Sequence, residues 1–196
     1  MMTSCCNTFF ASNVLLLCIF FLSSTAMSKP VQTRNLLTED NMRLVTDNVM
    51  GGVSRGEVKW SDQDEVQCLS LTGDVSTENN GGFIQAAMDI DSNDAESLTI
   101  EDGVILKVRG NGERYNVHLR TSNLWFPWQA YRATFETDEN WQTITIAFKN
   151  FIPYKTSSQL KPEKIKRIGI VAIGRDFKAD VCISELKFYK AKPDKE

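Results

Sequence analysis

The residues that could do chemistry in this sequence are few, and their types exclude the common catalytic centres. His118 is the only histidine, so a Ser-His-Asp triad or a histidine-rich metal site would depend on a single imidazole. No Gly-x-Ser-x-Gly sequence presents a nucleophile. Gly110-Asn111-Gly112 is followed by Arg114 and Tyr115 rather than by a helix, so it does not match a dinucleotide-binding loop. We therefore expect no catalytic residue, no enzymatic activity, no metal and no cofactor, NAD included.

One acidic segment imitates the start of a calcium-binding loop. Asp89, Asp91 and Asn93 stand at its first, third and fifth positions. The sixth position is Asp94 and the twelfth is Ile100, where the helix-loop-helix motif requires Gly and Glu. The motif is broken, so we favour a solvated loop, with a structural calcium site as the alternative.

Binding chemistry is concentrated in three other clusters. Residues 47–54 and residues 76–83 each contain a Gly-Gly pair beside Asn or Asp, a composition typical of tight turns. Residues 120–129 place three aromatic residues within four positions, beside a proline. Aromatic rings next to polar groups suit stacking on a sugar or a hot spot for a protein partner. The residues that we expect to bind are Asn48, Met50, Asn79, Asn80, His118, Arg120, Trp125, Trp128 and Tyr131.

Short strands must position these clusters. Alternating or β-branched and aromatic segments, separated by Gly, Asn, Asp or Pro, predict strands along most of the chain. They cover residues 65–71, 82–90, 103–108, 115–120, 128–135, 141–148, 167–173 and 181–189, with two more at 43–47 and 53–60. Only residues 157–164 suggest a turn of helix. About 8–10 antiparallel strands predict an all-β, two-layer sandwich of the jelly-roll type.

One hairpin is expected between residues 104–108 and 115–120, because Gly110-Asn111-Gly112 can adopt the positive φ angles of a tight reversal. On its second strand the odd-numbered side chains are apolar or aromatic and suit a core. The even-numbered ones, Asn116, His118 and Arg120, form a polar row. We expect this row to line the outer, concave surface of the sandwich.

The N-terminus has the plan of a secretory signal peptide. Residues 1–28 carry no charge, residues 14–22 are continuously apolar, and Ser24 and Ala26 are small residues before a cut after position 26. The apolar core is shorter than a membrane-spanning helix requires, so we expect export to the periplasm or the exterior, with membrane attachment only through an uncleaved signal. The predicted organisation is a signal peptide (1–26), a linker (27–40), one β-sandwich domain (41–190) and a charged tail (191–196).

The number of cysteines and the net charge limit the compartment and the class of partner that we expect. Cys68 and Cys182 remain once the signal is removed. In an oxidising compartment they form one disulfide or stay as two buried thiols. The chain has 22 basic and 25 acidic residues and a net charge of -3, with no Lys/Arg block of the kind that neutralises phosphates. Residues 161–167 are the densest basic stretch, which we interpret as a solvated loop face rather than a polyanion site. We therefore expect no nucleic-acid partner.

Three ordered motifs resemble the complex I intermediate-associated protein 30 family. Residues 48–54 are NVMGGVS and residues 79–83 are NNGGF, similar to the GVMGGVS-like and NNGGF-like segments of that family. A longer block from Leu119 to Pro153 carries the family's pattern of aromatic residues. The resemblance spans roughly residues 43–189 and departs slightly at Asn48, where the family commonly has glycine.

This resemblance implies a galactose-binding-like jelly roll. It also implies a role like that of the family's mitochondrial members, which are assembly factors that hold intermediates of respiratory complex I. We therefore expect a non-catalytic, chaperone-like module that engages a protein partner or complex subunit. The alternative is an extracytoplasmic carbohydrate-binding module that holds a glycan on its aromatic loop. The family also makes a mitochondrial location the alternative to export, although the first arginine is Arg34, late for an Arg-rich presequence.

Overall fold

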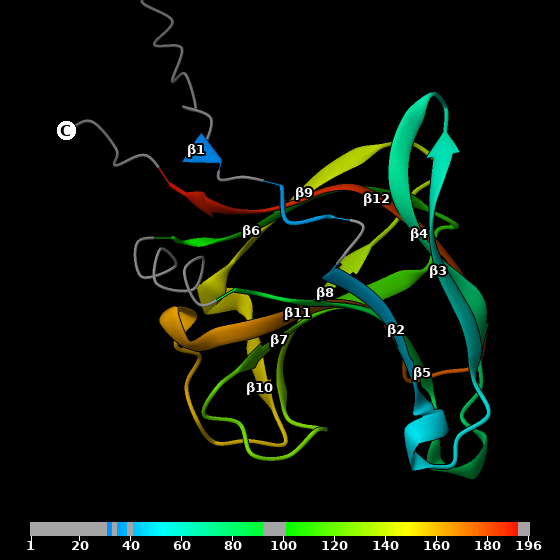
Figure 1. Cartoon of the computed structure of the whole chain (residues 1–196), viewed down its shortest axis with the longest axis horizontal. Helices are drawn as coiled ribbons and strands as arrows, with labels where there is room; N and C mark the ends of the chain where they lie inside the picture. Colours follow the sequence, from blue (N-terminus) through cyan, green and yellow to red (C-terminus); the bar gives the residue numbers. More distant parts are fainter. Residues whose placement is uncertain (1–30, 33–34, 39–40, 92–100, 192–196) are drawn as a thin grey trace, which may run out of the picture.

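The computed structural model describes residues 31–32, 35–38, 41–91 and 101–191, which form two antiparallel sheets packed face to face (Figure 1). Within this part of the chain each sheet has six strands. The first sheet has the order β3 (Arg55–Gln63), β4 (Val66–Val75), β12 (Phe177–Lys190), β6 (Gly103–Gly110) and β9 (Gln142–Ala147), and β1 (Val31–Gln32) also pairs with β12. The second has the order β10 (Ile152–Tyr154), β8 (Ala130–Glu136), β7 (Arg114–Thr121), β11 (Ile165–Ile173), β5 (Phe83–Asp89) and β2 (Met42–Thr46).

Short 3-10 turns join several of these strands. They are η2 (Asp47–Met50), η3 (Glu78–Asn80), η5 (Phe148–Asn150) and η6 (Pro162–Lys164). The turn η6 occupies the end of the segment for which the sequence suggested a helical turn, and Pro162 begins it, since the first turn of a helix tolerates a residue without an N–H.

Alternation along the strands builds the core. In β7, Tyr115, Val117 and Leu119 are fully buried, while the residues between them are partly exposed. They pack against apolar side chains of the other sheet, such as Leu71 and Leu106. The predicted all-β jelly-roll sandwich is confirmed, and each predicted strand is present with small shifts at its ends. The sequence pattern does not predict β1 or β10, because two or three residues are too few to show alternation.

The predicted hairpin between β6 and β7 is wrong, because the two strands belong to different sheets. The segment between them carries the chain from one sheet to the other. The backbone N–H of Gly110 donates to the carbonyl oxygen of Asp138 (2.8 Å), and Asn111 Nδ2 donates to the carbonyl oxygen of Lys178 (2.8 Å). These bonds to distant segments replace the strand pairing that a hairpin would make.

Packing of the domain begins before residue 41, the predicted boundary. The backbone N–H of Leu36 donates to the carbonyl oxygen of Leu186 (2.8 Å), and Asn35 Oδ1 accepts the N–H of Leu186 (2.9 Å). The side chains of Leu36 and Leu37 are buried in the core. Residues 35–37 are therefore part of the packed domain. Among the described residues, no helix is long and apolar enough to cross a membrane.

A disulfide joins Cys68 of β4 to Cys182 of β12. The two strands are neighbours in the first sheet, and Ser61 Oγ of β3 lies 3.7 Å and 3.5 Å from the two sulfur atoms. The bond links residues 114 positions apart. In the chain-entropy model, closing a loop of this length stabilises the fold by about 4–5 kcal/mol.

Candidate binding site

The outer face of the second sheet, the side turned away from the core, carries a band of polar side chains. Strand register aligns Arg120 of β7 with Arg167 of β11, and Arg167 with Asp89 of β5. The next row aligns His118 of β7 with Arg132 of β8. The sheet thus gathers polar residues from distant parts of the chain onto one surface, because alternate side chains of each strand point away from the core.

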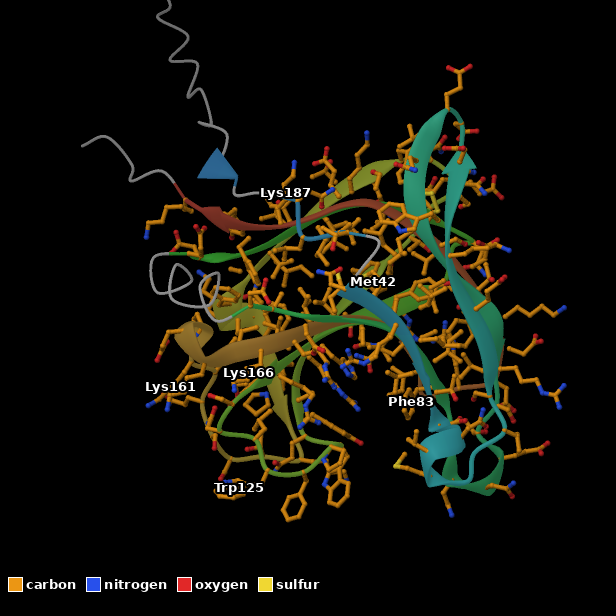
Figure 2. All side chains as sticks on the ribbon, viewed as in Figure 1. Met42, Phe83, Trp125, Lys161, Lys166 and Lys187 are labelled. Carbon is orange, nitrogen blue, oxygen red and sulfur yellow. A yellow bond between two sulfur atoms is a disulfide. The ribbon has the colours of Figure 1, made fainter. Side chains whose placement is uncertain are left out.

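A groove of about 890 Å³ opens at one end of this band. It lies between the end of β5, the loop that joins β7 to β8, and the segment from η6 into β11. Figure 2 shows Lys166 and Trp125 above and below this region. The groove is lined by Asp89, Ile90, residues 120–122, 124, 125 and 127, and residues 163–167.

An ion network crosses the outer face beside the groove. Asp89 accepts hydrogen bonds from Arg43 Nη1 (2.5 Å) and from Arg167 Nε (2.7 Å). The hydrogen bond from Arg43 is the main reason that the pKa of Asp89 lies below its ordinary value, although burial opposes it. Arg120 is held differently: its Nη1 donates to the carbonyl oxygen of Pro127. Burial and the nearby Arg167 both lower the pKa of Arg120.

His118 and Arg132 are paired in register on the outer face, and each contains a buried nitrogen atom. Among the described residues, His118 Nε2 and Arg132 Nε are buried without a hydrogen-bond partner. Burial, with a smaller effect of Arg132, lowers the pKa of His118 to about 3, so its imidazole is neutral at physiological pH. The guanidinium carbon of Arg132 lies 3.1 Å from the centroid of the Tyr154 ring, a stacking arrangement typical of arginine. Both nitrogen atoms are thus shielded from solvent in the folded protein, while the Arg132 side chain as a whole is partly exposed.

In the aromatic loop, residues 122–129, one glutamine side chain makes three of the hydrogen bonds that fix the backbone. Gln129 Oε1 accepts the backbone N–H groups of Trp125 and Phe126, each at 3.0 Å, and its Nε2 donates to the carbonyl oxygen of Lys155 (3.0 Å). Trp125 lines the groove and is 89% exposed. Trp128 does not line the groove; it stacks on Phe126 with centroids 4.9 Å apart and an interplanar angle of 7°. The loop thus offers one ring to the groove and a stacked pair outside it.

The two Gly-Gly clusters serve the fold. Both surround the Asp47 side chain, which is fully buried. Its Oδ2 accepts the Ser54 hydroxyl (2.5 Å) and the N–H groups of Gly82 (2.5 Å) and Phe83 (3.2 Å), and its Oδ1 accepts the Ser54 N–H (3.0 Å). Burial by itself raises the pKa of Asp47, but these hydrogen bonds outweigh it and the pKa lies below its ordinary value. We call residues 47–54 and 76–83 the Asp47 cluster.

Gly52 and Gly81 are required in the Asp47 cluster because the Asp47 side chain leaves no space for a Cβ atom. A Cβ at Gly52 would lie 2.3 Å from Asp47 Cγ, and a Cβ at Gly81 would lie 2.4 Å from Asp47 Oδ2. Both distances are too short for non-bonded atoms. The two motifs that carry the family resemblance therefore make one close-packed turn structure.

The predicted binding residues of the Asp47 cluster do not reach the groove. None of Asn48, Met50, Asn79 and Asn80 lines it. Asn48 Nδ2 donates to the carbonyl oxygen of Ser54 (3.3 Å), so this side chain holds the turn. Asn79 and Asn80 have φ of 56° and 58°, a left-handed conformation that asparagine tolerates. Met50 is 55% exposed.

Tyr131 is wrong as a ligand-binding residue. Its side chain is fully buried in the core, and its hydroxyl donates to the carbonyl oxygen of Gln159 (3.0 Å). The reason is strand alternation: Tyr131 shares the inner face of β8 with Ala133 and Phe135, while Arg132 points outward. The structure does bring together His118 and Arg120, and it places Trp125 at the adjoining groove.

Three outer-face residues escaped the sequence prediction: Asp89, Arg132 and Arg167. The signal for Arg132 was available, since it alternates with the apolar residues of β8. Asp89 and Arg167 meet only through the pairing of β5 with β11, which no local pattern specifies. Among the described residues, no group of three or more His, Cys, Asp or Glu could hold a metal ion. Most of the calcium-like loop, residues 92–100, lies outside the described residues.

Comparison with solved structures places the fold among carbohydrate-binding modules. A family 11 carbohydrate-binding module from Clostridium thermocellum, in complex with a β-1,3-1,4-mixed-linked tetrasaccharide, superposes with a TM-score of 0.65 at 12% identity, covering 83% of this chain and 96% of the module. A second family 11 structure, from a cellulosomal cellulase of that organism, gives 0.67 at 11% identity, covering 85% and 98%. A family 30 module from another cellulosomal cellulase of Clostridium thermocellum gives 0.58 at 10% identity, covering 85% and 100%.

At these identities the likeness shows the fold, a galactose-binding-like jelly roll. No curated protein matches the chain. The family model described as complex I intermediate-associated protein 30 matches residues 31–183, which include both Gly-Gly motifs and the aromatic loop. The chain therefore belongs to the complex I intermediate-associated protein 30 family.

Proposed function

We propose that this protein is a non-catalytic, exported binding module that holds a saccharide in the groove beside the outer face of the second sheet. The observation that carries the proposal is Trp125, which is 89% exposed at the groove on a loop fixed by Gln129. A large apolar ring held toward solvent has no folding role here, and a rigid ring beside polar groups suits stacking on a sugar face.

The polar groups around the groove supply the second half of sugar recognition. Arg120, Asp89 and Arg167 lie in one row across three strands, and their guanidinium and carboxylate groups donate to and accept from hydroxyl groups. A site that pairs one apolar surface with a few well-placed polar groups is typical of small-ligand recognition. The tetrasaccharide bound by the family 11 module of the same fold supports this ligand class.

Export is supported by two independent features. The uncharged N-terminus has the composition of a signal peptide, and the Cys68–Cys182 disulfide is of a kind that persists in oxidising compartments and is rare in the cytosol. An exterior or periplasmic location would bring the protein into contact with polysaccharides.

A second candidate function is engagement of a protein partner, as expected of an assembly factor. The observation that favours it is the stacked pair Phe126 and Trp128, each 52% exposed outside the groove. Tryptophan is enriched in protein hot spots, and the family takes its name from association with complex I intermediates.

Two single variants separate these functions, because Trp125 lines the groove and Trp128 does not. Under the saccharide proposal, Trp125→Ala weakens binding to a glycan panel at least tenfold, from the loss of about 1.5–3 kcal/mol of ring burial, and Trp128→Ala leaves glycan affinity within twofold. Affinity electrophoresis in soluble polysaccharides measures both. If Trp125→Ala binds glycans as wild type does, the groove is not the sugar site; a protein partner lost only with Trp128→Ala would establish the second function.

A further inference from the structure

The outer face carries more positive charge than its own acidic groups neutralise. Four of the side chains that line the groove are basic and two are acidic. One of these acids, Asp89, already pairs with Arg43 and Arg167. Within the described part of the chain, no carboxylate pairs with Arg120 or Arg132: Arg120 donates to a carbonyl oxygen, and Arg132 stacks on Tyr154.

This local excess is opposite in sign to the whole chain, whose net charge is -3. General basicity therefore does not account for it. Guanidinium groups bind carboxylate and sulfate oxygens through two parallel hydrogen bonds. The face is built for a ligand that is both polar and negatively charged.

Arg120 and Arg132, the two arginines without a carboxylate partner among the described residues, also have a suitable spacing. Register places Arg132 opposite His118, and Arg120 lies two residues further along β7, so the two arginines are diagonal neighbours on adjacent strands. Diagonal neighbours are about 7–8 Å apart at the backbone, and long side chains from both reach a single short ligand. Trp125 borders the groove that Arg120 also lines.

We infer that the ligand is an anionic saccharide, one that bears uronate carboxylates or sulfate esters, with its charged groups held by Arg120 and Arg132 while a sugar ring stacks on Trp125. This inference rests on the proposed saccharide-binding function and specifies its ligand class. A neutral glucan leaves both guanidinium groups without an anionic partner in a partly desolvated site, so it binds less tightly.

The test compares four soluble polymers by affinity electrophoresis and calorimetry: polygalacturonate, a sulfated galactan, a neutral mixed-linked β-glucan, and polyglutamate as an anion without sugar. We expect polygalacturonate or the sulfated galactan to bind at least tenfold more tightly than the β-glucan and the polyglutamate, with affinity that decreases as salt increases. The stronger of the two anionic glycans identifies the charged group.

Three variants assign the effect to the outer face. Arg132→Gln and Arg120→Gln each weaken binding of the anionic glycan at least tenfold, and either one suffices if the other fails to fold. Arg55→Gln is the matched control, since Arg55 is an exposed arginine on β3 of the first sheet, and it leaves affinity unchanged.

The outcomes separate the two proposals. Tight β-glucan binding that is lost in Trp125→Ala but unchanged in both arginine variants would overturn the anionic ligand and leave saccharide binding intact. Polyglutamate binding as tight as that of the glycans would overturn recognition of the sugar. Binding of none of the glycans would overturn both proposals.

Discussion

The Asp47 cluster and the groove differ in how their polar atoms are used. Asp47 is fully buried, and its carboxylate accepts four hydrogen bonds from Ser54, Gly82 and Phe83. At the outer face His118 Nε2 and Arg132 Nε have no partner among the described residues, and Trp125 is mostly exposed. The first region is complete within the chain. The second exposes an apolar ring and holds two arginines, Arg120 and Arg132, that have no carboxylate partner among the described residues.

This contrast separates what identifies the family from what binds. The NVMGGVS and NNGGF motifs are recognisable because a buried carboxylate and two glycines without space for a Cβ tolerate few substitutions. Arg120, Arg132 and Arg167 form no contiguous motif, since each comes from a different strand. Members of the family can therefore share the first region and differ in the second.

The largest expected effect is the loss of the Asp47 charge. Asp47→Asn places an amide NH₂ against backbone N–H groups, so buried donors lose their acceptors, and we expect destabilisation of about 3 kcal/mol. Urea denaturation measures this loss of stability. The control is Asp62→Asn, at an exposed position of β3, which we expect to change stability by less than about 0.5 kcal/mol. Equal stability of the two variants would show that the Asp47 cluster does not support the fold.

Gly51 and Gly52 test separately whether close packing around Asp47 stabilises the fold. Gly52→Ala forces a Cβ against Asp47 Cγ, and we expect it to cost about 2 kcal/mol by overpacking. Gly51 has φ of 89° with open space around it, so Gly51→Ala meets only backbone strain of about 1 kcal/mol. The difference in urea midpoint between the two variants tests whether a steric clash with Asp47 is the reason that position 52 requires glycine. A larger loss in Gly51→Ala would contradict it.

His118 and Asp47 should also change the stability of the fold over different pH ranges. The pKa of His118 is about 3 in the folded protein, lowered mainly by burial, against about 6.5 in the unfolded chain. Below pH 6.5 the unfolded chain takes up a proton that the folded protein does not, so stability falls with decreasing pH, by at most about 1.4 kcal/mol per unit. The pKa of Asp47 is lowered, so its contribution is lost only below about pH 3.9.

Denaturation of His118→Gln and wild type at pH 7, 6 and 5 isolates the histidine effect. We expect a shallower pH dependence in the variant across this range, where the Asp47 carboxylate stays ionised. Parallel profiles would mean that His118 titrates normally in the folded protein and is open to solvent.

The smallest expected effect is at Met50, which is 55% exposed on the Asp47 cluster and away from the groove. Met50→Ser should change stability by less than about 0.5 kcal/mol and glycan affinity by less than twofold. A clear loss of glycan binding in Met50→Ser would show that the Asp47 cluster is part of the binding surface.

Much of the fold follows from local pattern, because alternation of apolar residues is a property of each strand alone. The same alternation predicts that Tyr131 is buried, because it shares one face of β8 with Ala133 and Phe135. The prediction of a ligand role for Tyr131 depended instead on its position next to the aromatic loop in sequence. The path of the chain after β6, which crosses to the other sheet, and the hydrogen bond from Gly82 to Asp47 depend on segments far apart in sequence. Turn composition cannot distinguish a reversal within one sheet from a crossing between two. The row of Arg120, Arg167 and Asp89 likewise exists only through pairing of non-consecutive strands.

Backbone amide shifts during titration with the bound glycan test the central claim most directly, since they report both regions in one measurement. We predict perturbation of residues 118–129, 132 and 163–167, with no change in the Asp47 cluster, residues 47–54 and 76–83. Shifts concentrated in the Asp47 cluster, with the outer face unchanged, would contradict the account.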